Sequence, residues 1–455
     1  MWLESLCSGE ATSGAKSGVA DAQNASRHRL LPATRKLADV GRDVGVAVTA
    51  GLVDVSCSQK RISSMKPVSL VEDVRLAPTS PLAARPLLLC FSHLRWDFVF
   101  QRPQHIMTRA AADYDVIYIE EPRDADDGQP NWQIARSGSV TVATPLLPPG
   151  GSHDDRVIGQ ARLVETLLKG RTPDVLWYYT PMALEFSDDI PAAVMVYDNM
   201  DELALFHGAD SRIRQLEARL LARADVVFTG GHSLYVAKRH LHDNIHPVPS
   251  SVDVAHFRLN AAAPIADPAD QVDIAHPRVG FFGVIDERMD MALVDALAML
   301  CPETQFVMVG PTVKIDPASR PQRDNIHWLG GKTYDQLPSY LHHWDCGFMP
   351  FALNDATRFI SPTKTPEFLA AGLGVVSTAI PDVENPYGDL GLVGIADDAA
   401  AFAAALPAAI AAGADPLWQV RVRRQLTKSS WDSTWAFIQS EIDAVTTPIQ
   451  EARNA

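Results

Sequence analysis

The fold is decided by the stretch Ser361-Pro362-Thr363-Lys364-Thr365-Pro366-Glu367-Phe368-Leu369-Ala370-Ala371-Gly372, which is followed by the apolar run Gly374-Val375-Val376-Ser377-Thr378. It predicts a loop, a short helix and a buried strand, with Ser361 or Thr365 as the cap, Pro362 or Pro366 in the first turn and Gly372 at the end. A helix start favours an anion, and Lys364 adds a cation there. Glu367 lies about one turn further along, where a carboxylate can accept hydrogen bonds from ribose hydroxyls. This spacing indicates a pocket for a nucleotide diphosphate. The alternative is a solvated Lys364 and a Glu367 that only supports the first turn.

The composition is that of a globular protein long enough for two or three domains. The chain has 455 residues, of which 47% are hydrophobic and 21% charged. Its net charge of −15 argues against general nucleic-acid binding. Its five cysteines include no Cys-x-x-Cys pair, which suits a reducing cytoplasm, predicts no zinc site and leaves Cys90 and Cys346 for strand cores. No apolar run reaches the length of a membrane span and the N-terminus has no apolar signal core, so we expect a cytoplasmic protein.

Residues 1–84 differ in composition from the rest of the chain. No aromatic residue occurs between Trp2 and Phe91, and Ser, Ala and short charged residues dominate without a sustained period. We predict a disordered or weakly structured extension over residues 1–84. We also hypothesise that Met65 or a nearby codon is the true start, which N-terminal sequencing that finds Trp2 first would refute.

From residue 85 onward, apolar runs of strand length alternate with helical patterns, and the alternation breaks into Ala, Pro and Asp between Arg258 and His276. Runs that are apolar throughout and separated by helices are typical of parallel strands covered on both faces. We therefore predict two tandem Rossmann-like, doubly wound α/β domains, over 85–262 and 275–414, that face each other across a cleft. Helices over 415–447 are expected to pack back on the body through Trp418, Trp431, Trp435 and Phe437.

Ligands of doubly wound sheets bind beyond the carboxyl ends of the strands. No Gly-x-Gly-x-x-Gly follows a strand, and the sequence has no Gly-Lys-Ser/Thr P-loop. Dinucleotide redox enzymes and P-loop ATPases are therefore disfavoured.

The chain resembles the GT-B glycosyltransferases, and within them glycosyltransferase family 4, or group 1, in a bacterial subgroup. The resemblance covers about Pro86 to Ile442 and is specific as a set of motifs rather than singly. The matching segments are Ser92-His93-Leu94-Arg95-Trp96-Asp97-Phe98-Val99-Phe100-Gln101-Arg102-Pro103-Gln104-His105, Tyr197-Asp198-Asn199-Met200-Asp201-Glu202, Gly280-Phe281-Phe282-Gly283-Val284-Ile285-Asp286-Glu287-Arg288, Ala356-Thr357-Arg358-Phe359-Ile360-Ser361-Pro362-Thr363-Lys364 and Ser430-Trp431-Asp432 through Trp435.

The resemblance implies transfer of a sugar from a nucleotide-diphosphate donor with retention of the anomeric configuration and no required metal or other cofactor. It implies that Lys364, with Ser361, Pro362 and Thr363, holds the donor phosphates and that Glu367 holds the ribose. Arg288 is expected to offer a second cation, so that Lys364, Arg288 and Asp198 form the catalytic set. Two departures stand out. Phe359 occupies the place of the family's first acid, eight residues before Glu367, and Gly283-Val284 replaces the family's usual Gly-Arg.

On the acceptor side we expect Trp96 to stack on a sugar face, and Arg102 and Gln104 to bind hydroxyls or an acidic group. Asp198, Asp201 and Glu202 follow a strand, and one of them is expected to orient the acceptor hydroxyl. The alternatives are a core Trp96, an ion-paired Arg102 and an Asp201 that caps the following helix. The four histidines near the expected cleft are interpreted as structural or solvated: His93, His105, His207 and His232.

The leading hypothesis is a glycosyltransferase of cell-surface polysaccharide or glycolipid synthesis, with a nucleotide sugar and a saccharide or lipid-linked acceptor as its partners. Peripheral contact with the inner membrane is compatible with such an acceptor, although no basic amphipathic helix stands out in the sequence. Two alternatives remain open: a sugar-nucleotide 2-epimerase of the same fold, and a catalytically silent nucleotide-sugar binder. Sugar isomerisation without an acceptor would indicate the first, and donor binding without turnover the second.

Overall fold

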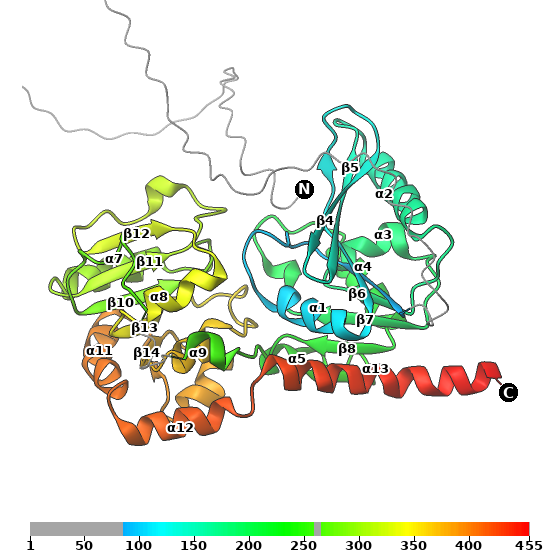
Figure 1. Ribbon diagram of the computed structural model, residues 1–455. Coiled ribbons are helices and arrows are strands. Elements are labelled where there is room, and N and C mark those ends of the chain that lie inside the picture. The colour runs from blue at the N-terminus through cyan, green and yellow to red at the C-terminus, as the bar shows by residue number, and fades with distance from the viewer. Residues whose placement is uncertain (1–84, 259–264, 455) are drawn as a thin grey trace, which may run out of the picture. The chain divides into compact units, whose positions relative to one another are not determined.

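The computed structural model describes residues 85–258 and 265–454, which belong to one compact unit (Figure 1). The predicted extension over 1–84 and part of the predicted linker, 259–264, lie outside the described residues. The prediction of an α/β fold with two tandem parallel-sheet domains is confirmed, because the described residues form two sheets that are each flanked by helices.

The first sheet has nine strands in the order β3-β5-β2-β1-β6-β7-β8-β9, with β4 paired antiparallel to β5. All its other pairings are parallel, and its buried side chains form one core cluster on each face. Its strands are β1 (Leu87–Phe91), β2 (Asp115–Ile119), β3 (Arg123–Asp124), β4 (Asn131–Ser137), β5 (Val140–Leu147), β6 (Val175–Tyr178), β7 (Val194–Asn199), β8 (Val226–Thr229) and β9 (Ile245–Pro247). Its helices are α1 (Arg102–Asp113), α2 (His153–Leu168), α3 (Leu184–Ser187), α4 (Ile213–Arg223) and α5 (His232–Lys238), whereas α6 (Val254–Phe257) follows β9 and packs on the core of the second domain.

The second sheet has six parallel strands in the order β12-β11-β10-β13-β14-β15. The chain first builds outward from β10 to β12 and then resumes on the other side of β10 with β13, so the switch in direction falls between β10 and β13. In open α/β sheets this is where ligands bind. The strands are β10 (Arg278–Phe282), β11 (Gln305–Val309), β12 (Ile326–Gly330), β13 (Cys346–Met349), β14 (Val375–Ser377) and β15 (Gly394–Ile395), and the helices among and after them are α7 (Met291–Leu300), α8 (Leu337–Leu341), α9 (Lys364–Ala370), α10 (Pro381–Val383) and α11 (Ala399–Ala412).

The apolar runs predicted most of the parallel strands, which are buried on both faces, but not the short parallel strands β3 and β9. Cys90 and Cys346 lie in β1 and β13 and are fully buried, as expected. The runs did not predict β4, whose side chains are mostly exposed. They also placed the end of β7 too early, because the strand continues through Asp198 and Asn199.

The C-terminal helices α12 (Pro416–Leu426) and α13 (Trp431–Asn454) pack on different cores. Trp418 joins the core of the second domain, whereas Trp431 and Trp435 join the core of the first, which confirms that they dock the tail. The indole Nε1 of Trp435 donates to the Asp113 carboxylate at 3.0 Å. Phe437 remains 39% exposed and contacts His246.

Among the helices that the structure describes, none by itself combines the length and apolar character needed to cross a bilayer. Within the same residues, one pair of helices, α11 and α12, has the required length and composition when the two are taken together, but the pair is bent by 90° at the break between them.

Candidate active site

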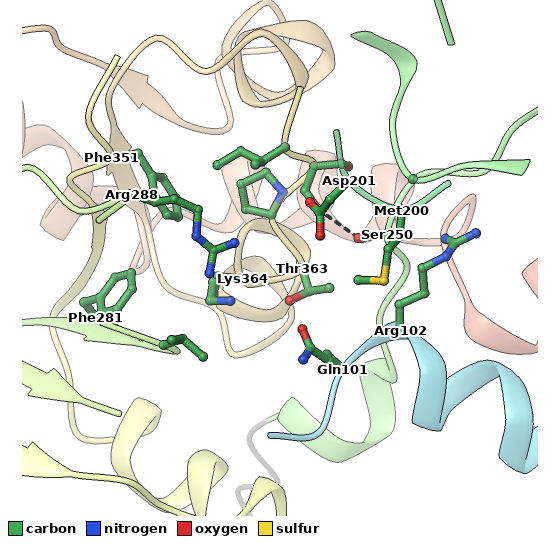
Figure 2. A pocket seen from close by; sticks show the side chains of 15 residues that line it. Gln101, Arg102, Met200, Asp201, Ser250, Phe281, Arg288, Phe351, Thr363 and Lys364 are labelled. Carbon is green, nitrogen blue, oxygen red and sulfur yellow. Dashed lines mark hydrogen bonds between the residues drawn. The ribbon is translucent and has the colours of Figure 1, made fainter. Parts of the chain in front are cut away.

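A cavity lies where loops that follow the strands of both sheets come together (Figure 2). The second domain supplies the loops after β10 and β13, the two strands on either side of its switch point. The first domain supplies the loops after β1, β7, β8 and β9. The side chains that decide its chemistry are Lys364, Arg288 and Asp201, and the predicted phosphate-binding residues Ser361, Pro362 and Thr363 also line it.

Lys364 is the first residue of α9, and its ammonium reaches into the cavity from the side of the second sheet (Figure 2). A side chain at Gly283 would leave only 2.3 Å between its Cβ and Lys364 Cε, and Gly283 has a φ of +134°. Glycine is therefore required after β10 for the lysine to pass. Burial lowers the pKa of Lys364, while the nearby Glu367, Asp286 and Asp201 carboxylates raise it.

The start of α9 differs from the prediction in two respects. Thr363, and neither Ser361 nor Thr365, precedes the first helical residue. The amides of Thr365 and Glu367 donate to the carbonyls of Pro362 and Thr363, both at 3.3 Å. Those two amides are therefore engaged within a helix of only seven residues and are not available to an anion. Gly372 follows the helix end with a φ of +85°, as predicted.

Glu367 is 5% exposed and does not line the cavity. Burial raises the pKa of its carboxyl, while the Lys364 ammonium and a hydrogen bond from the Thr363 hydroxyl lower it. Glu367 therefore lies behind Lys364 as its electrostatic partner. Its expected contact with a ribose stays a prediction.

Arg288 follows β10, and its guanidinium lies beside Lys364 in the cavity (Figure 2). Its Nε and Nη2 donate to both carboxylate oxygens of Asp286, at distances of 2.7–3.1 Å. The guanidinium also lies 5.6 Å from the centroid of the Phe206 ring. Asp286 thus holds Arg288 in place, and Nη1 has no hydrogen-bond partner within the part of the chain that the structure describes.

Asp201 follows β7 and lines this cavity together with a second one that continues from it. Within residues 85–258 and 265–454 its carboxylate makes no hydrogen bond. Burial raises the pKa of Asp201 to about 6, while the cations Arg288 and Lys364 lower it. Asp201 is therefore the carboxylate that the first domain presents to the two cations of the second.

Asp198 does not reach the cavity, which corrects its predicted catalytic role. Its side chain is fully buried, and both oxygens accept from Arg102, the closest contacts being 2.9 and 3.0 Å. Arg102 also donates to the Val248 carbonyl at 2.7 Å. Figure 2 shows its guanidinium turned away from Lys364, so only its stem lines the cavity. The pair joins α1 to β7, and burial of the Arg102 guanidinium removes it from an acceptor in the cavity.

Trp96 and Gln104 also have structural surroundings. The Trp96 ring packs edge-on against Tyr118, with centroids 4.9 Å apart, on the core of the first domain. Gln104 is 1% exposed and donates to the carbonyls of Trp96 and Val99 at 2.8 and 3.0 Å. Both residues hold the loop before α1. The predicted acceptor contact of Gln104 is wrong because its side chain is buried, whereas that of the half-buried Trp96 stays a prediction.

Glu202 faces away from the cavity, which corrects its assignment to the acceptor. It pairs with Lys238 at 2.7 Å, beside a groove between α4 and α5. Phe359 lines the same groove, so the position that carries an acid in the resembled family is outside the cavity of Lys364.

A buried network under the Asp201 loop was not predicted. The Tyr197 hydroxyl donates to Glu217 at 2.7 Å and accepts from the Asn199 amide at 2.8 Å. The same amide donates to the backbone carbonyl of Asp201 at 2.9 Å. Lys238, which is 5% exposed, binds Glu217 on the far side. Glu217 and Lys238 lie far from Tyr197 in the sequence, so no local pattern indicated the network.

Two of the four histidines are defined by their surroundings. His105 is stacked on Trp431 with centroids 4.5 Å apart, and burial lowers its pKa to about 3, so it is structural as expected. His93 lines the adjoining cavity together with Asp201, Phe206 and Lys314, and burial lowers its pKa to about 4. His93 is thus a cavity residue that the sequence analysis set aside.

The two domains contact each other around the cavity through short polar contacts. The Ser250 hydroxyl donates to the Ser361 carbonyl at 2.9 Å, and the Ser233 amide donates to Asp382 at 2.8 Å. The first contact holds the loop before α9 against the first domain, and the second holds α10 there. Within the described residues, no group of three or more His, Cys, Asp or Glu side chains is placed to hold a metal ion.

The fold is that of the GT-B glycosyltransferases. Residues 276–411 match the family model described as "Glycosyl transferases group 1". Among curated proteins the chain is similar to TuaH of Bacillus subtilis (strain 168), named for a glycosyltransferase of teichuronic acid biosynthesis. The two are 28% identical over 185 residues, which are 38% of this chain and 46% of TuaH, so the match spans about half of that relative.

Solved structures share the fold at low identity. Sucrose-phosphate synthase from Thermosynechococcus elongatus aligns with a TM-score of 0.62 and 14% identity, over 80% of this chain and 100% of that chain. The E. coli trehalose-6-phosphate structure bound with UDP-2-fluoro glucose aligns with a TM-score of 0.56 and 13% identity, over 78% of this chain and 98% of that one.

Proposed function

We propose that the protein transfers a sugar from a nucleotide-diphosphate sugar to a saccharide or glycolipid acceptor in cell-surface polysaccharide synthesis, with retention of configuration. The observation that carries this proposal is the convergence of Lys364 and Arg288 on one cavity at the switch point of the second sheet. Two cations there match the charge of a pyrophosphate. The named activity of TuaH and the UDP-sugar bound in the E. coli structure support the same class of reaction.

The chemistry follows from where charge develops. When the glycosidic bond of the donor breaks, the leaving diphosphate gains negative charge, and Lys364 and Arg288 stabilise that charge more in the transition state than in the ground state. Asp286 keeps the guanidinium of Arg288 in position, so little reorganisation is needed as the charge grows. In this proposal the two side chains supply the positive charge, and no metal is required.

Asp201 faces these cations from the first domain, where the acceptor is expected to bind. Its ionised carboxylate accepts a hydrogen bond from the acceptor hydroxyl and orients it toward the anomeric carbon. The first acid of the resembled family is absent at Phe359, so Asp201 supplies a carboxylate to this cavity from the opposite side.

A thermal-shift panel of UDP-, GDP-, ADP- and dTDP-sugars tests the donor site. A ligand at 100 times its Kd should stabilise the fold by about 2.7 kcal/mol. The nucleotide sugar that binds is then incubated with the protein and an acceptor extract, and free nucleoside diphosphate and the anomeric configuration of the product are measured. Binding without turnover would support a silent binder, and isomerised sugar without acceptor would support an epimerase. No stabilisation by any nucleotide sugar would reject the proposal.

A further inference from the structure

The outer face of α12 carries cations that have no carboxylate partner within the described residues. Arg421, Arg423, Arg424 and Lys428 follow one another on this helix and its C-terminal end, and all four are exposed. No Asp or Glu lies between Pro416 and Ser430. The chain as a whole has a net charge of −15, so this cluster is a local departure from its composition.

Apolar side chains extend the same face toward the start of the helix. Leu417 is 76% exposed and Val420 is 53% exposed. With 3.6 residues per turn, Leu417, Val420, Arg421 and Arg424 fall on one side of the helix. The opposite side carries Trp418, Val422 and Leu426, which are buried in the core of the second domain. The helix is thus fixed by one face and presents the other to its surroundings, at the lower border of this domain in Figure 1.

We propose that this α12 face, Leu417, Val420, Arg421, Arg423, Arg424 and Lys428, docks the protein on an anionic lipid bilayer. Arginine and lysine side chains are attracted to anionic headgroups, while an exposed leucine and valine can enter the boundary with the acyl chains. A nucleic acid or an acidic protein would pair with the cations but would not bury the exposed Leu417 and Val420 side chains. The combination favours the bilayer.

The position of α12 connects this surface to the candidate active site. The side-chain amide of Gln419 donates to the carbonyl of Gly372, two residues beyond the end of α9, at 3.0 Å. Docking through α12 would therefore hold the domain that carries Lys364 at the bilayer, where a lipid-linked acceptor resides. The docking itself does not depend on the proposed sugar transfer.

The test is co-sedimentation of the full chain with phosphatidylcholine vesicles that either contain or lack phosphatidylglycerol. The wild type is expected to bind only the anionic vesicles and to be released by high salt. Replacing Arg421, Arg423, Arg424 and Lys428 by Gln together should lower the partition coefficient at least about tenfold. The double substitution Leu417→Ser and Val420→Ser should weaken binding to the anionic vesicles but should leave the salt dependence of that binding unchanged.

The matched control removes four exposed cations elsewhere, with Arg136, Arg162, Arg214 and Arg239 each replaced by Gln. It changes the net charge equally and should retain most of the vesicle binding. Equal losses in the two variants, or no binding of the wild type to anionic vesicles, would overturn the proposal, as would tighter binding to RNA that the same α12 substitutions remove. Thermal unfolding of each variant checks that it is folded. Vesicle binding with no sugar transfer would reject only the proposed function.

Discussion

The two domains present charge to the same cavity through different kinds of pairing. In the second domain the partners are near in sequence: Asp286 lies two residues before Arg288, and Glu367 lies three residues after Lys364. In the first domain they are distant, since Asp198 pairs with Arg102 across 96 positions and Glu202 pairs with Lys238. The local pairs leave their cations facing the cavity. Of the three acids at or just after the end of β7, the distant pairs engage Asp198 and Glu202 and leave Asp201 at the site.

The largest expected effect comes from breaking the distant pair. Arg102→Met leaves the Asp198 carboxylate buried without a counter-charge, and we expect it to lower the free energy of unfolding by about 3–5 kcal/mol. Urea unfolding measures the loss. Arg109→Met is the matched control on the same helix, because its partner Asp432 has a side chain that is 84% exposed. That change should cost under about 1 kcal/mol. Equal losses would show that burial of the first pair is unimportant.

In the second domain the corresponding test is on catalysis. Lys364→Ala should lower kcat by about 10²–10³-fold, since a preorganised charge at the leaving group contributes mainly in the transition state. The Kd for the donor should change less. Lys364→Arg keeps a charge but not its geometry, and should recover part of the rate. Loss of donor affinity with unchanged turnover would mean that Lys364 only binds the ground state.

Asp201→Asn compares the two domains directly, and we expect a fall in turnover of roughly 10²-fold. The pKa of Asp201 is raised to about 6, so its carboxylate is ionised above that pH and protonated below it. Wild-type activity should therefore rise with pH through about 6 as the carboxylate becomes available to the acceptor hydroxyl. The groups that face Asp201 and set this midpoint are Arg288, Lys364, Asp286 and Arg102.

The Asn variant should lack that rising limb. Asp189→Asn, at an exposed acid of the first domain, is the control and should leave the pH profile unchanged. A rising limb near pH 6 that persists in Asp201→Asn would assign the titration to another group.

The same contrast explains how much the sequence could predict. Both parallel sheets could be predicted from the sequence, because strands covered on two faces are apolar along their whole length. The strand β4 could not be predicted, because its side chains are mostly exposed. Lys364 was found because helix spacing and turn residues are local information. Arg102, Asp198 and Glu202 were misassigned because their partners are 96 and 36 positions away, and only the folded chain brings these charges together. The role of the α12 face likewise depends on which side of that helix the core covers.

The smallest expected effect tests whether the buried network under Asp201 matters for the site. Tyr178 and Tyr197 are register partners on β6 and β7, and both hydroxyls are buried and hydrogen-bonded, to Ser187 at 2.8 Å and to Glu217 at 2.7 Å. Replacing either by Phe should cost about 0.5–1.5 kcal/mol of stability. Only Tyr197→Phe removes the acceptor of the Asn199 amide, which holds the Asp201 carbonyl.

We therefore expect Tyr197→Phe alone to reduce turnover, by roughly threefold to tenfold, with the donor Kd unchanged, because a small displacement of Asp201 misaligns the acceptor hydroxyl. Steady-state kinetics of the two variants, compared at equal folded fraction, provides the measurement. Equal reductions would show that the network only stabilises the domain. A reduction confined to Tyr197→Phe would show that distant pairing in the first domain does for Asp201 what Asp286 does locally for Arg288.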